Sequence, residues 1–158
     1  MERRVKGHTI LDFGCGPGRF SSALAKLTMG HVVAFDICKE LIEMAPAHPL
    51  VEYFYGSDAP IFTPSHSYDL VWLCLVCGGI PDEILGTIAH KITNHLDNQG
   101  MILLIDHITD GDVDTGNNFW KFRSLDKYHQ LFKGIEFCKV GMYFEAGNPI
   151  TVLAGKVA

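Results

Sequence analysis

Three glycines within five positions, directly after a short apolar run, constrain this chain more than any other feature. The run is His8–Phe13, and Gly14, Gly16 and Gly18 follow it, before a stretch with helical spacing, Phe20–Thr28. Glycine permits positive φ and leaves bare backbone for a ligand to approach, and a helix N-terminus offers unpaired N–H groups. We therefore expect a strand–turn–helix unit that binds a ligand at the turn.

Apolar runs and helical stretches alternate along the first two thirds of the chain. The runs are continuously apolar, as expected for strands that helices cover on both faces. This pattern predicts an α/β fold with a Rossmann-like, doubly wound, mostly parallel sheet. The expected strands are His8–Phe13, His31–Asp36, Val51–Tyr55, Tyr68–Leu75 and Met101–Asp106, and the expected helices are Phe20–Thr28, Cys38–Ala45 and Pro81–Leu96.

The last third of the sequence has a different pattern. A polar loop is expected over Asp106–Asn118 and a helix over Phe119–Phe132. Two β-type stretches follow, Ile135–Phe144 and Ile150–Val157. The short linker "EAGNP" cannot make a parallel crossover, so the two stretches should pair as an antiparallel hairpin.

Composition limits the class of protein. The chain has 158 residues, of which 47% are hydrophobic and 20% charged, and we expect residues 1–158 to form a single domain. The net charge of −5 argues against nucleic acid as a partner, and no apolar stretch has the length of a membrane helix. Five scattered cysteines suit reduced thiols, so we expect a cytoplasmic protein with no membrane partner.

One acid precedes the glycine turn, and another ends the next expected strand. Asp36 ends the second expected strand, roughly the ~20 residues onward at which a carboxylate binds a ribose. The glycine spacing is G-x-G-x-G, whereas a dinucleotide fingerprint would place its third glycine at Arg19. Asp12 would repel a pyrophosphate but suits a cationic ligand. A nucleotide-like ligand is indicated, with an NAD-dependent oxidoreductase as the less favoured alternative.

The residues D-F-G-C-G-P-G (12–18) resemble the first motif of the class I S-adenosylmethionine-dependent methyltransferases. The resemblance continues through the order of motifs from His8 to Val157. It implies the seven-stranded methyltransferase fold, which ends in an antiparallel hairpin. It also implies S-adenosyl-L-methionine as the cofactor and S-adenosyl-L-homocysteine as its product.

The same resemblance implies which residues contact the cofactor. Asp36 would hold the ribose hydroxyls, Asp58 with its neighbour Ser57 would meet the adenine, and the fourth-strand motif would lie against the cofactor. A tight turn, a helix cap and an ordinary loop acid are the structural alternatives for these features. The implied set is Asp12, Gly14, Cys15, Gly16, Gly18, Asp36, Ile37, Ser57, Asp58, Leu75 and Val76.

The acceptor side is less defined. Methyl transfer is an in-line displacement that depends mainly on alignment, with a base needed only if the acceptor must lose a proton early. His107 is the best candidate base, although a structural histidine that bonds the neighbouring loop is the favoured alternative. By analogy, Phe119, Trp120 and Arg123 would line a small-molecule acceptor pocket, with Arg123 pairing an acidic acceptor. The chain lacks the Asn/Asp-Pro-Pro-aromatic motif, which disfavours amide and nucleobase acceptors.

Two further patterns resemble metal-binding motifs. Asp110, Asp112 and Asp114 start like a calcium loop, but Thr115 stands where that loop needs glycine. Cys74 and Cys77 form C-x-x-C within or just beyond a strand and have no second pair. We expect no metal site.

One departure from the family concerns the N-terminus. Only seven residues precede the first expected strand, where family members normally carry helices that cover the cofactor. Either the chain is a fragment of a catalytic domain, or a homodimer or partner subunit supplies the lid, or the site is unusually open. A non-catalytic S-adenosylmethionine-binding subunit is therefore a second alternative function.

Overall fold

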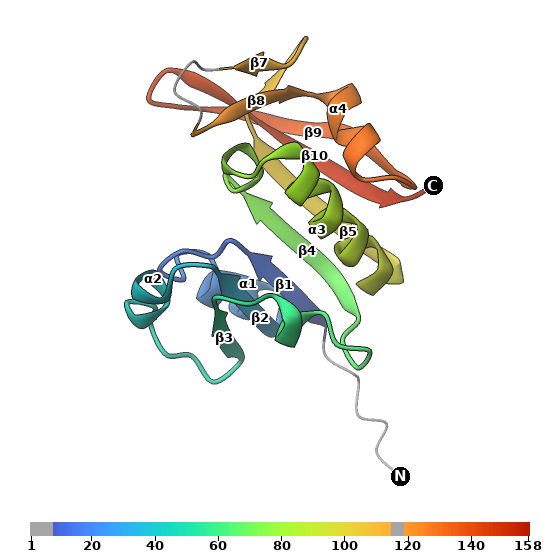
Figure 1. Cartoon of the computed structure of the whole chain (residues 1–158). Helices are drawn as coiled ribbons and strands as arrows, with labels where there is room; N and C mark the ends of the chain where they lie inside the picture. The colour runs from blue at the N-terminus through green and yellow to red at the C-terminus, as the bar shows by residue number, and fades with distance from the viewer. Residues whose placement is uncertain (1–7, 115–118) are drawn as a thin grey trace.

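A computed structural model describes residues 8–114 and 119–158, and its main feature is a seven-stranded sheet. The strand order is β3-β2-β1-β4-β5-β10-β9 (Figure 1). Strands β1 to β5 run parallel to one another, and β10 is antiparallel to both β5 and β9. The predicted doubly wound sheet with an antiparallel C-terminal hairpin is confirmed. Its strands are β1 (Thr9–Phe13), β2 (His31–Asp36), β3 (Val51–Tyr55), β4 (Tyr68–Cys74), β5 (Leu96–Asp106), β9 (Ile135–Glu145) and β10 (Asn148–Val157).

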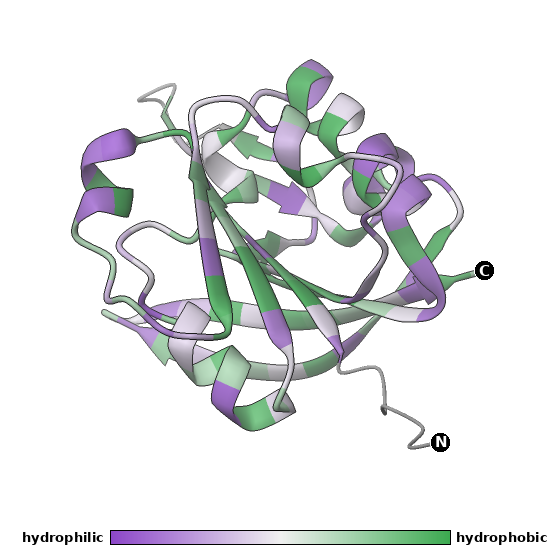
Figure 2. Ribbon diagram, turned by 90° about the horizontal axis from the view of Figure 1, so that it is seen from below, coloured by the Kyte–Doolittle hydropathy of each residue, from purple (hydrophilic) through white to green (hydrophobic). Residues whose placement is uncertain are grey.

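Helices pack on both faces of this sheet. On one face the core lies between the strands and the buried side of α3, and α4 closes it beside β9 (Figure 1). On the other face α1 packs over β1 and β2. Figure 2 shows the central strands as mostly hydrophobic, which fits burial on both sides. The helices are α1 (Ser21–Thr28), α2 (Lys39–Glu43), α3 (Asp82–His95) and α4 (Leu125–Leu131), with single turns η1 (Ala59–Ile61) and η2 (Cys77–Gly79).

The segment before β9 corrects the sequence analysis. The predicted polar loop contains β6 (Ile108–Thr109) and β7 (Val113–Asp114), and residues 115–118 lie outside the described part. The predicted helix over Phe119–Phe132 is wrong in its first half, which forms β8 (Lys121–Ser124) between β6 and β7. The Ser124 side chain then caps α4 by accepting a hydrogen bond from Lys127 N at 3.1 Å. Pairing with β6 and β7 overrides the local helical spacing.

Arg123 connects β8 to the turn after β4 through hydrogen bonds. Its side chain is 1% exposed, and its guanidinium donates to the carbonyls of Cys77 and Ile80. It also pairs with Asp82 at the start of α3, at 2.8 Å. The prediction that Arg123 pairs an acidic acceptor is therefore wrong, because its donors are used inside the fold.

We predict that Arg123→Met lowers the free energy of unfolding by roughly 2 kcal/mol or more, since two buried carbonyls lose a charged donor. Urea unfolding followed by circular dichroism measures this. Lys121→Met is the matched control, because Lys121 is half exposed and reaches the same Asp82 at 3.9 Å. Lys121→Met should lower the free energy of unfolding by less than about 1 kcal/mol. An equal loss of unfolding free energy in the two variants would show that the buried hydrogen bonds of Arg123 do not stabilise the fold more than a surface ion pair does.

Candidate functional site

A cavity of about 940 Å³ opens at the carboxyl ends of β1, β2 and β4. In open α/β sheets this is the edge at which ligands bind. The glycine turn, the loop after β3 and the first turns of α3 supply its walls. Most of the predicted cofactor residues line it, namely Gly14, Gly16, Asp36, Ile37, Ser57, Asp58, Leu75 and Val76.

The three glycines of the turn lack side chains for different reasons. A Cβ on Gly14 would lie 2.3 Å from Cγ2 of Val76, and one on Gly18 would lie 2.6 Å from the hydroxyl of Tyr53. A Cβ on Gly16 would meet no atom within 4 Å and would enter the open space beside the turn. Gly16 is thus the position at which the missing side chain leaves room for a ligand, whereas its neighbours permit close packing.

Asp36 ties the glycine turn to the end of β2. One carboxylate oxygen accepts a hydrogen bond from Gly16 N at 2.8 Å, and the other accepts one from Cys38 N at 2.9 Å. A carboxylate has about four acceptor positions, so both oxygens retain capacity for a ligand hydroxyl. The carboxylate is therefore held in place at the cavity wall, and its contact with a ribose stays a prediction.

Asp12 lies beneath the turn rather than among the cavity's lining residues. Its side chain is 2% exposed and accepts a hydrogen bond from the Ser21 hydroxyl at 2.6 Å. Burial raises the pKa of Asp12 to about 6; the Ser21 hydrogen bond opposes this rise and the charge of Asp36 adds to it. Cys15 and Gly18 are likewise buried and outside the lining.

Leu75 and Val76 form the wall where β4 ends. Leu75 is held in the left-handed region at φ 51°, and its N–H donates to the Ile105 carbonyl at 2.8 Å. This conformation costs a non-glycine residue about 1–2 kcal/mol, and such strain concentrates at functional sites. The strained turn brings two consecutive apolar residues to the cavity.

Helix α3 contributes a wall that sequence reasoning missed. Ile84, Ile88 and Lys91 line the cavity, one helical turn apart, beside the stripe of α3 that faces the core. Ile84 is 55% exposed, so it lies outside the core-facing stripe of α3. An apolar residue at such a position was the sequence signal that could have identified this wall. Lys91 also binds Asp58, with Nζ 2.7 Å from Oδ2, which fixes the acid predicted to meet the adenine.

The residues predicted for the acceptor side lie in different places in the structure, and only one of the three described below lines the cavity. Trp120 lines the cavity and packs against Gly78, where a Cβ would lie 2.2 Å from its Nε1. Phe119 is 82% exposed and lies outside the lining. His107 is also outside it: Nδ1 lies 3.1 Å from the Pro149 carbonyl, and the ring stacks on Phe122 at 4.5 Å. His107 thus takes the structural alternative of bonding a neighbouring segment.

Within residues 8–114 and 119–158, no group of three His, Cys, Asp or Glu side chains is placed to hold a metal. Cys74 and Cys77 are free thiols, and the carboxylate of Asp112 accepts hydrogen bonds from Ser124. Among the same described residues, no helix has the length and apolar character needed to cross a membrane.

Comparison with known proteins identifies the family. The model of the methyltransferase domain family matches residues 10–100, which is more than half of the chain. The chain is 27% identical over 154 residues to alpha N-terminal protein methyltransferase 1 of Drosophila melanogaster, covering 86% of this chain and 53% of that protein. It is 27% identical over 139 residues to the 2-methyl-6-phytyl-1,4-hydroquinone methyltransferase of Synechocystis, covering 82% and 43%.

Solved structures share the fold. A SAM-dependent methyltransferase of Leishmania major superposes with a TM-score of 0.79 at 22% identity, covering 96% of this chain and 65% of that one. The magnesium protoporphyrin IX methyltransferase of Synechocystis, solved with bound SAH, gives a TM-score of 0.75 at 15% identity, covering 98% and 76%.

The chain therefore belongs to the methyltransferase domain family, and the class I S-adenosylmethionine-dependent class predicted from its motifs is confirmed. It spans about half or less of the length of the curated relatives it matches. S-adenosylmethionine is the cofactor of this class. The cavity suits it, because open space beside Gly16 adjoins apolar walls and the carboxylates of Asp36 and Asp58.

Burial of Asp12 predicts a defined pH dependence of stability. Because its pKa is raised to about 6 in the folded protein, the fold binds its proton more tightly than the unfolded chain does. Relative to Asp12→Asn, the wild type should lose up to about 3 kcal/mol of unfolding free energy as the pH rises from about 4 to above about 6. Urea titrations of both proteins across this range measure the difference. A difference that does not change with pH would contradict the shift.

Gly16→Val should abolish binding of S-adenosylhomocysteine, since the new side chain occupies the open space beside the turn. Isothermal titration calorimetry measures this. Gly134→Val is the matched control: Gly134 also has positive φ, at 81°, and faces open space, but it lies outside the cavity. The control shares the backbone strain and should bind normally. Normal binding by Gly16→Val would show that the turn is not the cofactor site.

Proposed function

We propose that this chain binds S-adenosylmethionine in the 940 Å³ cavity and transfers its methyl group to a small-molecule acceptor. The observation that carries the proposal is the opening at Gly16, flanked by a carboxylate that is already held in place, Asp36. When bound, the cofactor supplies an activated methyl group on a sulfonium.

Each part of the cavity has a distinct role in this proposal. The backbone around Gly16 takes the methionine part, and Asp36 binds the ribose hydroxyls. Asp58, held by Lys91, accepts a hydrogen bond from the adenine amino group. Leu75 and Val76 cover an apolar side of the cofactor. Together these residues orient the methyl group, and alignment supplies much of the rate enhancement of a displacement reaction.

Several observations support a small-molecule acceptor. The names of the Synechocystis relatives specify a hydroquinone and a magnesium porphyrin, and the chain lacks the motif of the branch that methylates amides and nucleobases. A protein N-terminus is the second candidate, because the Drosophila relative is named for that substrate. The alternative functions, a nicotinamide-dependent oxidoreductase and a non-catalytic subunit, receive no support from the comparisons.

Calorimetric titration with S-adenosylmethionine and with S-adenosylhomocysteine tests the proposal, and one-to-one binding is expected. Asp36→Ala should weaken binding by roughly 1.5–3 kcal/mol, the scale for hydrogen bonds to a charged group. Asp97→Ala is the control, since Asp97 is exposed, outside the cavity, and accepts a similar local backbone hydrogen bond from Gln99. Absence of binding by the folded wild-type protein would refute the proposed function.

A further inference from the structure

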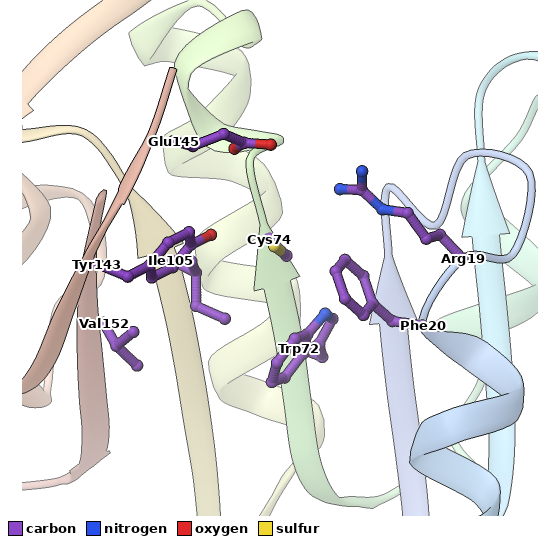
Figure 3. Close-up of a pocket in the computed structure, with 8 residues that line it drawn as sticks. All are labelled: Arg19, Phe20, Trp72, Cys74, Ile105, Tyr143, Glu145 and Val152. Carbon is purple, nitrogen blue, oxygen red and sulfur yellow. The ribbon is translucent and has the colours of Figure 1, made fainter. Parts of the chain in front are cut away.

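A second cavity, of about 520 Å³, lies on the other face of the sheet (Figure 3). Alternate residues of a strand point to opposite faces. Val71 and Leu73 of β4 face the α3 side, whereas Trp72 and Cys74 point to the α1 side and line this cavity. Its remaining lining comes from the end of the glycine turn, from β5 and from the β9–β10 hairpin.

The two cavities share a wall. Arg19 lines the second cavity and directly follows the glycine turn that lines the first. Cys74 lines the second cavity, and the next residue, Leu75, lines the first. A molecule in the second cavity would therefore lie across the turn and the end of β4 from the cofactor. The two linings adjoin at Cys74 and Leu75, so ligands in the two cavities can approach each other at the end of β4.

The second cavity combines an aromatic floor with two opposed charges. The rings of Phe20 and Trp72 lie 5.5 Å apart, and Tyr143 stands on the hairpin side. Arg19 and Glu145 lie on opposite sides of the opening, as Figure 3 shows. Neither has an ion-pair partner within the described ranges.

Trp72 also carries a buried hydrogen-bond donor. Its Nε1 is buried and has no hydrogen-bond partner among the described residues. Buried polar groups in proteins are nearly always paired, so an unpaired donor beside a cavity is unusual. With an aromatic surface, a cation and an anion, the second cavity offers more than an internal packing gap requires.

We propose that the second cavity binds the methyl acceptor, and that the acceptor is a small aromatic acid carrying a hydroxyl group. This inference rests on the proposed function. The ring of the acceptor packs on Trp72, because the Arg19 guanidinium already lies over the Phe20 ring, 4.8 Å from its centroid. The anionic group of the acceptor pairs with Arg19, and its hydroxyl donates a hydrogen bond to Glu145. Aromatic stacking and a charge-assisted hydrogen bond together give both affinity and orientation.

The cofactor's own carboxylate has the same chemistry as the anionic group proposed for the acceptor. Arg19 therefore has two conceivable partners, one in each cavity. The proposal assigns Arg19 to the acceptor, so Arg19→Met should leave the affinity for S-adenosylhomocysteine unchanged.

The chain's two tryptophans allow the location to be tested, because Trp72 lines the second cavity and Trp120 the first. The two indole N–H signals of the ¹⁵N-labelled protein are assigned with Trp72→Phe and Trp120→Phe. S-adenosylhomocysteine should shift the Trp120 signal. With S-adenosylhomocysteine saturating, 4-hydroxybenzoate should then shift the Trp72 signal in a saturable titration.

Chemical and protein variants test the two charged contacts. Arg19→Met should weaken 4-hydroxybenzoate at least about tenfold, the scale of one charge-assisted hydrogen bond. The neutral analogue 4-hydroxybenzyl alcohol should bind wild type and Arg19→Met alike. Glu145→Gln should weaken 4-hydroxybenzoate but not benzoate, which lacks the hydroxyl. Lys133→Met, which removes an exposed cation outside both cavities, is the control and should change nothing.

The outcomes separate this inference from the proposed function. If S-adenosylhomocysteine does not bind, the proposed function fails. If it binds but 4-hydroxybenzoate leaves the Trp72 signal unmoved, the acceptor proposal is overturned and the cofactor site stands. If Arg19→Met weakens S-adenosylhomocysteine instead, Arg19 belongs to the cofactor site and the acceptor proposal is again overturned.

Discussion

The hydrogen bonds between the glycine turn and the end of β2 are the constraint on which the rest of the site depends. The amides of Gly14 and Cys15 both donate to the Phe35 carbonyl, at 2.8 and 2.9 Å, and the Gly16 amide donates to Asp36. These contacts convert a glycine-rich segment, which would otherwise have the largest conformational freedom of any backbone, into a fixed edge. The cavity of about 940 Å³ has one rigid wall because two neighbouring strands share these donors and acceptors.

A buried polar network stabilises the other wall, at the turn after β4. Asp106 accepts hydrogen bonds from Gly78 N at 2.9 Å and from the Tyr128 hydroxyl at 3.3 Å, and burial raises the pKa of its carboxyl group. Arg123 binds the carbonyls of the same turn from the side of β8. The turn is thus held from both sides by charged groups, which are nearly always paired when they are buried.

The site as a whole has two cavities on opposite faces of one sheet edge, separated by the glycine turn and the end of β4. The first is the larger and is lined in part by α3, and its carboxylates are fixed by backbone amides or by Lys91. The second is smaller and more aromatic, with charges at its opening.

The sequence alone determined the parallel α/β fold, the terminal antiparallel hairpin, the ligand-binding turn and the acid that ends β2. Each of these follows from short-range signals: continuous apolar runs, a linker too short for a crossover, and glycines at fixed spacing from an acid. Tertiary structure alone decided that Gly16 faces open space while Gly14 packs on Val76, that Arg123 is buried, and that residues 121–124 form a strand. It also decided that the cavity uses a second stripe of α3 and that Trp72 and Arg19 share a separate cavity. These features depend on contacts between residues far apart in the chain, and local spacing carries no information about such contacts.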